Sequence, residues 1–174
     1  MKENNKVLEK GKELFSILDK LVLLHRNLID ALQEEYSHMG NVDVKSLQEV
    51  ARTKEALLNE IWNCENSRIR SAEELCFFLE IPIQNATVSS IALQLSHTQS
   101  EILKNYRTVL DMLVAQTKEL NKRNQAFAEQ SLVRIEEMKR NVLGLNNNNQ
   151  ENYSSSGTRQ TLNQTGGRLL STEA

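Results

Sequence analysis

The chain has 174 residues, of which 39% are hydrophobic and 25% are charged, and its formal net charge at pH 7 is −2. This length fits one domain. The nearly balanced charge, without a cluster of Lys or Arg, gives no electrostatic reason to bind nucleic acid or an anionic membrane. With only six glycines and one proline, the turns must be few and the elements between them long.

The N-terminal residues lack the apolar region followed by small residues that a secretory signal needs. The segment from Leu14 to Leu32 is rich in Leu and Ile, but charged residues such as Asp19 and Arg26 interrupt it, so it cannot supply the roughly 20 apolar residues of a membrane span. We therefore expect a cytoplasmic protein. Cys64 and Cys76 would lie about 18 Å apart along one predicted helix, too far for a disulfide within it, which favours reduced, structural cysteines.

A first helix is predicted over residues 7–38. Its apolar residues recur at three- and four-residue steps, the spacing of one helix face. They are Leu14, Ile17, Leu18, Leu21, Leu24, Leu28, Leu32 and, just beyond, Met39. Gly40 and Asn41 indicate a stop, because glycine accepts the left-handed conformation that ends many helices. Asp43 can then cap a new helix, so the chain folds back after a short turn.

A second helix is predicted over residues 43–80, before Pro82, since a residue that precedes proline avoids helical geometry. Opposite charges three or four residues apart in its middle are typical of a solvated face. Its apolar stripe is formed by Leu47, Val50, Ala51, Leu57, Leu58, Ile61, Trp62, Ala72, Leu75 and Leu79. We interpret Trp62, and Tyr106 in the next helix, as core residues rather than as contacts to a cofactor.

A third helix is predicted over residues 89–143, with N-caps offered by Thr87, Ser89 and Ser90. No Gly or Pro interrupts it before Gly144. About 55 residues give a helix of about 80 Å, more than a compact domain of this size can cover. Its stripe consists of Ile91, Leu95, Ile102, Tyr106, Val109, Leu113, Leu120, Phe127, Ile135, Met138, Val142 and Leu145.

The difference in helix length predicts an exposed end on the third helix. The second helix, with about 38 residues, can cover only about 57 Å of the third, which from Ser89 ends near Phe127. Beyond that point six apolar residues would overhang without an intramolecular partner: Leu132, Val133, Ile135, Met138, Val142 and Leu145. Such a stripe is a candidate site for a partner helix. The alternatives are a kink that folds this end back, or self-association.

The tail, residues 146–174, has few apolar groups, and ordering about 25 residues at about 1 kcal/mol or more each exceeds what these groups return on burial. It is either a solubilising terminus or a recognition segment that orders on binding. The predicted fold is therefore all-α: an elongated antiparallel three-helix bundle or coiled coil over residues 1–145, with a long third helix and a disordered C-terminal tail.

Catalytic chemistry is not indicated by any motif. The three histidines show no ligand spacing for a metal, and no glycine cluster precedes a helix to form a phosphate loop. The adjacent acidic pairs Glu34-Glu35, Glu73-Glu74 and Glu136-Glu137 point to different sides of a helix and are interpreted as surface charges. We expect no enzyme activity, no cofactor and no metal.

Three motifs resemble a known family when taken in order. Residues 54–61 (KEALLNEI), followed by Glu65 and Arg68, resemble the second helix of the FlgN family of flagellar export chaperones. Residues 120–127 (LNKRNQAF), followed by residues 130–132, are similar to the Asn-containing pattern before the last helical turns of that family. Residues 152–157 (NYSSSG) resemble its tyrosine-and-glycine signature. The resemblance covers the chain from about Leu14 to Gly157.

This resemblance implies a soluble, cytoplasmic, non-enzymatic chaperone that holds flagellar hook-associated proteins before export through the flagellar type III apparatus. Members bind the C-terminal helical ends of those proteins through their own C-terminal part. On matching positions, the predicted substrate contacts are Phe127, Leu132, Ile135, Met138, Val142 and Leu145. Tyr153 matches the tyrosine implicated in docking onto the cytoplasmic domain of the export gate, although the spacer of residues 146–149 moves it away from the helix.

A protein of a different class would show the same near-heptad spacing. In that alternative the chain is a structural coiled-coil homodimer or adaptor without a role in export, and it uses the same stripe to dimerise. The chaperone reading predicts instead a monomer or weak dimer. The oligomeric state of the purified chain therefore separates the two.

Overall fold

The computed structural model describes residues 2–41, 43–143, 152–153 and 159–160. Up to residue 143 these residues are helical or lie in short turns, which confirms the all-α prediction. The helices are α1 (Lys2–Asn41), α2 (Val44–Phe78), the 3₁₀ helix η1 (Ile83–Asn85), α3 (Val88–Gln94) and α4 (His97–Val142), and the strands are β1 (Asn152–Tyr153) and β2 (Arg159–Gln160). The chain forms two units, Met1–Gln125 and Ala126–Ala174.

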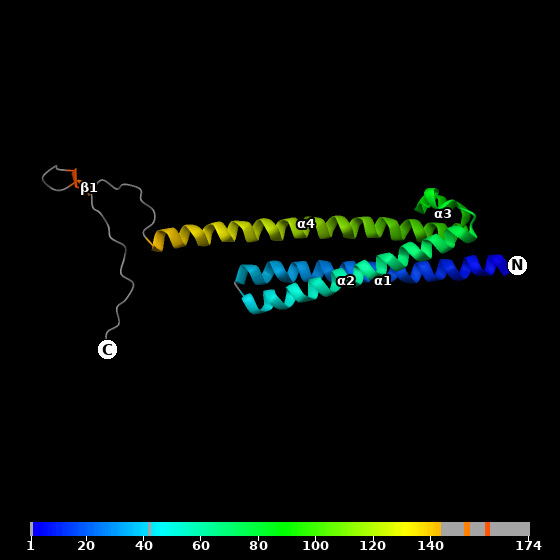
Figure 1. Ribbon diagram of the computed structural model, residues 1–174, viewed down its shortest axis with the longest axis horizontal. Helices are drawn as coiled ribbons and strands as arrows, with labels where there is room; N and C mark the ends of the chain where they lie inside the picture. Colours follow the sequence, from blue (N-terminus) through cyan, green and yellow to red (C-terminus); the bar gives the residue numbers. More distant parts are fainter. Residues whose placement is uncertain (1, 42, 144–151, 154–158, 161–174) are drawn as a thin grey trace. The chain divides into compact units, whose positions relative to one another are not determined.

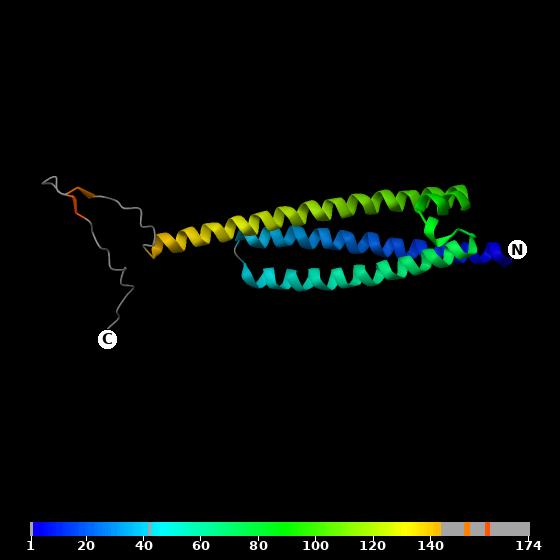
Figure 2. The same ribbon diagram turned by 45° about the horizontal axis from the view of Figure 1, so that its top comes forward.

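Within the first unit, α1 and α2 form an antiparallel hairpin and lie side by side in both views (Figures 1 and 2). The part of α4 that belongs to this unit, residues 97–125, runs along α1 in the same direction. In the second unit, β1 pairs with β2 in antiparallel register, Asn152 opposite Gln160 and Tyr153 opposite Arg159. The predicted boundary at residue 145 and most of the predicted disordered tail lie outside the described residues.

The turn between α1 and α2 lies where it was expected, but Gly40 does not end α1. Gly40 is helical rather than left-handed, and α1 runs from Lys2 to Asn41, beyond both ends of the predicted range 7–38. Asp43 caps α2: its Oδ1 accepts from the Ser46 backbone N–H at 3.2 Å, and its Oδ2 accepts from the Ser46 hydroxyl at 2.7 Å. These two hydrogen bonds stabilise the carboxylate and lower the pKa of Asp43. The cap therefore fixes the point at which the chain reverses.

The predicted third helix is divided in two. Thr87 caps α3 in a reciprocal capping box with Ser90, but α3 ends at Gln94 and Leu95 adopts an extended conformation (φ −86°, ψ 162°). Ser96 then begins α4, its hydroxyl accepting from the Gln99 N–H at 3.5 Å and bonding the Gln99 side chain at 2.9 Å. The prediction of a continuous helix from residue 89 missed this break, because a serine hydroxyl can replace a helical hydrogen bond without Gly or Pro.

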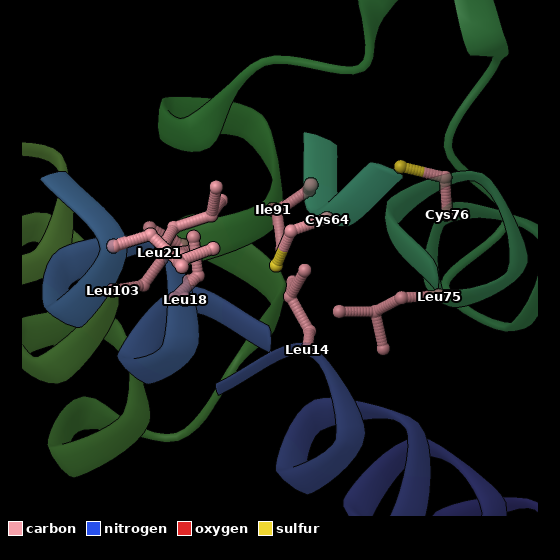
Figure 3. Close-up of a cluster of buried hydrophobic side chains, with 10 residues drawn as sticks. Leu14, Leu18, Leu21, Cys64, Leu75, Cys76, Ile91 and Leu103 are labelled. Carbon is pink, nitrogen blue, oxygen red and sulfur yellow. The ribbon is translucent and has the colours of Figure 1, made fainter. Parts of the chain in front are cut away.

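The core of the first unit is built from all four α-helices (Figure 3). Its buried members are Leu14, Leu18, Leu21 and Leu24 from α1, Cys64, Leu75 and Cys76 from α2, Ile91 and Ala92 from α3, and Leu103 from α4. Both cysteines are buried free thiols, and burial raises the pKa of each. The Cys64 thiol also lies 3.6 Å from the Ile17 carbonyl oxygen. The cysteines therefore act as small apolar core residues, as predicted.

Trp62 is not a core residue, contrary to the prediction. Its side chain is 68% exposed, whereas Ile61 packs against the core. Successive residues lie about 100° apart around a helix, so the two adjacent side chains point in different directions. Tyr106 is half-buried against the core, as predicted, and its ring stacks on Phe15 with a centroid distance of 6.0 Å. The apolar residues of α2 form a wide stripe, and the sequence alone does not indicate which edge of this stripe packs against the other helices.

Candidate partner-binding surface on helix α4

Helix α4 carries one stripe of residues that recur at three- and four-residue steps along nearly its whole length. At about 3.6 residues a turn, this spacing keeps them on one side of the helix. The inner stripe is Leu103, Tyr106, Leu110, Leu113, Thr117, Leu120 and Asn124, and the outer stripe is Phe127, Ser131, Ile135, Met138 and Val142. The inner stripe belongs to the first unit and the outer stripe to the second.

The inner stripe packs on α1. Leu103 is 3% exposed, and the Tyr106 hydroxyl donates to Asp19 Oδ1 at 2.6 Å. Burial, the bond to Asp19 and the charge of Asp19 together raise the pKa of Tyr106 to about 12. The phenol therefore stays protonated at neutral pH and keeps donating to α1.

The inner stripe ends in a polar layer formed by Asn124, Glu35 and Lys54, and Asn124 is 3% exposed. The Asn124 amide donates from Nδ2 to the Leu32 carbonyl oxygen at 2.7 Å and to Glu35 Oε2 at 2.9 Å. Lys54 Nζ of α2 donates to the other oxygen of Glu35 at 2.5 Å. The layer thus connects α1, α2 and α4. Because a shift of α4 along its axis would leave these groups buried and unpaired, the layer fixes the register of the helix.

This layer also corrects one interpretation from the sequence. Glu35 was interpreted as a surface charge, yet its side chain is only 20% exposed, and that of Lys54 is 19% exposed. The other acidic pairs contain exposed residues, and Glu74 forms an ion pair with Lys10 at 2.6 Å. The only sequence hint of the layer is a polar residue, Asn124, within an otherwise mostly apolar stripe, and it does not reveal the partners Glu35 and Lys54.

The outer stripe is exposed over most of its length. From Leu132 to Leu143 every residue is exposed. Four of the predicted contact residues lie between residues 132 and 143, with exposed fractions between 48% and 76%. Ile135, Met138 and Val142 belong to the outer stripe, and Leu132 lies beside it, about 100° from its centre. Phe127 is half-buried. This is an apolar surface of the kind that a partner helix covers.

Two other predicted site residues are described in part or not at all. Leu145 lies outside the described residues. The backbone of Tyr153 lies in β1, opposite Arg159 of β2. The roles given to both residues therefore stay predictions.

The histidines do not gather into a metal site in the part of the chain that the structure describes. His25 lies on α1, His38 near its end and His97 at the start of α4, and within the described ranges no group of three or more His, Cys, Asp or Glu could hold a metal ion. Neither does any helix in those ranges have the length and apolarity to cross a membrane. The prominent feature is the exposed outer stripe.

The chain matches a known protein family over most of its length. The sequence model described as FlgN protein matches residues 10–161, a range that includes α2, α3, all of α4 and β1. The chain belongs to the FlgN family. FlgN proteins are flagellar export chaperones and are not known as enzymes. No curated protein and no solved structure matches the chain. Within this FlgN protein, the outer stripe and Tyr153 both fall inside the matched range.

Proposed function

We propose that this FlgN protein is a cytoplasmic chaperone for flagellar hook-associated proteins. It binds their C-terminal helical regions, prevents their premature assembly and delivers them to the flagellar type III export apparatus. Family membership over residues 10–161 supports the chaperone role. The observation that carries the binding site is the exposed outer stripe on α4, since apolar helix faces of this kind are normally covered by another helix.

In this proposal the substrate helix lies along the end of α4. Its contacts are Phe127, Leu132, Ile135, Met138, Val142 and Leu145. Full burial of one such apolar side chain stabilises a complex by about 1.5–3 kcal/mol, so a few of them are enough for stable binding. Tyr153, separated from the helix by the asparagine-rich segment, docks onto the cytoplasmic domain of the export gate. No nucleotide is needed for either step.

The test is binding of hook-associated proteins from the same organism, measured by size-exclusion chromatography with light scattering. The wild-type chain should be a monomer that forms a discrete complex. The double variant Leu132→Asp with Met138→Asp should lose the complex, because two charges would be buried in an apolar contact. It should keep its helicity, because both side chains are exposed in the free chain.

A matched control places the same change on the opposite side of the helix. Ala126 and Val133 are exposed and lie about 140–160° from the centre of the outer stripe. Ala126→Asp with Val133→Asp should therefore bind like wild type. Loss of binding in both double variants, or loss of helicity in the first, would refute the proposed surface.

The role of Tyr153 is tested separately. Tyr153→Ala should keep the complex with hook-associated proteins but impair their export, because the substrate surface lies on α4. An unchanged export rate would remove Tyr153 from the proposal.

A second candidate function is a structural coiled-coil homodimer or adaptor, which the heptad-like spacing of the α4 stripe favours. In that case the purified chain would be a stable dimer that ignores hook-associated proteins. Its outer stripe would also be protected from hydrogen exchange in the absence of any other protein.

A further inference from the structure

The charged residues nearest the outer stripe are both basic. At 100° a residue, Arg134 and Lys139 lie about 60–80° from the centre of the stripe, one on each side. Both are exposed. In coiled-coil terms they occupy the two edge positions that flank the apolar seam and face the edges of a partner helix. The apolar surface around Ile135 and Met138 thus has a cation on each edge.

The acidic residues of the same segment lie on its other side. Glu129, Glu136 and Glu137 are exposed and lie about 120° or more from the centre of the stripe. Arg140 lies about 180° from that centre. Although residues 126–142 carry three acidic and three basic residues, the charges are sorted, and only basic ones border the apolar surface.

This sorting opposes pairing with a second copy along the outer stripe. In a parallel pair, Arg134 of one copy would face Lys139 of the other, since edge residues five positions apart meet. In an antiparallel pair, the edge that carries Arg134 would lie against the same edge of the other copy, and likewise the edge that carries Lys139. Both arrangements bring cations together on each edge, which destabilises the pair.

We propose that the outer stripe is occupied by an amphipathic helix of another protein that carries acidic residues on both edges of its own apolar stripe. The inference rests on the proposed chaperone function and specifies the substrate segment that this chain selects. Apolar contact supplies most of the binding, and the charged edges select the partner and exclude a second copy.

Two helical probe peptides of equal length and identical leucine stripe test this directly, one with Glu and one with Lys at every edge position. Fluorescence anisotropy with the full chain should show that the Glu-edged probe binds roughly fivefold to thirtyfold more tightly, from two attractive pairs gained and two repulsive pairs avoided. The ratio should shrink between about 0.1 M and 1 M salt, as the Debye length falls from about 10 Å to 3 Å.

Charge reversal assigns the selectivity to these edges. Arg134→Glu with Lys139→Glu should invert the preference, so that the Lys-edged probe binds more tightly. Arg140→Glu changes a charge on the opposite side of the same helix and should keep the wild-type preference. Circular dichroism checks that each variant stays helical. Equal binding of the two probes, or the same inversion with Arg140→Glu, overturns the inference.

The outcomes also separate this inference from the proposed function. If both probes bind equally and Leu132→Asp with Met138→Asp abolishes both, the docking surface stands and the charge selectivity falls. If neither the probes nor the hook-associated proteins bind, both proposals fall. A stable dimer of the wild-type chain with a protected outer stripe overturns the exclusion of a second copy.

Discussion

Helix α4 carries the same stripe through two different environments. In the inner stripe, Leu103 and Asn124 are 3% exposed, whereas Met138 in the outer stripe is 64% exposed. The spacing and the apolar character continue from one to the other, and only the neighbouring structure differs. Hydrophobic periodicity therefore indicates which side of a helix is apolar, but it does not indicate which structure, if any, packs against that side.

The polar members of the stripe differ in the same way. Asn124 donates to α1 residues at 2.7 and 2.9 Å, so it ties α4 to one register. The hydroxyl of Ser131 donates instead to the Phe127 carbonyl of its own helix, at 2.8 Å. The outer stripe thus contains no polar group that demands one partner position. In the proposed complex, selectivity would therefore depend on the charged edges of the stripe.

The largest expected effect on stability comes from a leucine-to-alanine substitution, compared between the first unit and the second unit. Leu103→Ala should lower the free energy of unfolding by about 2–5 kcal/mol, because it leaves a cavity in the core of the first unit. Leu132→Ala should change it by no more than about 0.5 kcal/mol, because the side chain is already exposed. Urea unfolding followed by circular dichroism measures both.

Leucine and alanine have similar helix propensities, so the difference reports cover rather than helix formation. Equal losses in the two variants would mean that the outer stripe is buried in the free protein, by a second copy or by another part of the chain. Light scattering on Leu132→Ala would tell these two apart.

A smaller effect is expected at the polar members of the stripe. Asn124→Ala should destabilise the chain by about 1–3 kcal/mol, because Glu35 loses one partner inside a largely covered layer. Ser131→Ala should be neutral or stabilising by about 0.5 kcal/mol, since alanine is the better helix former. The two unfolding midpoints, compared with wild type in the same urea series, test the register layer. A neutral Asn124→Ala would show that the layer does not hold α4.

Much of the fold could be predicted from the sequence because its signals are local. The helix caps at Asp43 and Thr87 follow from single residues with known backbone preferences, whereas α1 continues through Gly40 to Asn41, three residues past its predicted end. The break at Ser96 is local too, but serine hydroxyls occur inside many helices, and only the extended Leu95 before it reveals the interruption. The exposure of Trp62 depends on which edge of α2 is covered, and this is a tertiary fact.

The candidate site could be predicted in part. The apolar spacing indicated Leu132, Ile135, Met138 and Val142, and these residues are exposed. The polar layer could not be predicted, because Asn124 and Lys54 acquire their role only when Glu35 lies between them, and the three residues are far apart in the sequence. Resemblance to FlgN proteins indicated the family, whereas helix periodicity alone could not distinguish a chaperone from a coiled-coil dimer.

The smallest expected effect separates the two units by their response to acid. His25 is half-buried on α1, and its Nδ1 has no hydrogen-bond partner within the described part of the chain. Burial lowers the pKa of His25 from its ordinary 6.5, against the opposing charge of Glu65. Below pH 6.5 the unfolded chain therefore binds more protons than the folded one, and stability is lost as the pH falls toward the lowered pKa. This contribution to the loss of stability should disappear when His25 is replaced.

Urea unfolding of wild type and His25→Leu between about pH 7.5 and 5.5 measures this contribution. The wild-type midpoint should fall more steeply with acid than that of His25→Leu. Residues 126–142 contain no histidine, so binding of the Glu-edged probe should stay constant while the folded fraction is high. A parallel slope for His25→Leu would show that proton binding by His25 does not weaken the first unit. If probe binding weakened before unfolding began, the binding surface on the outer stripe would itself depend on the protonation of the first unit.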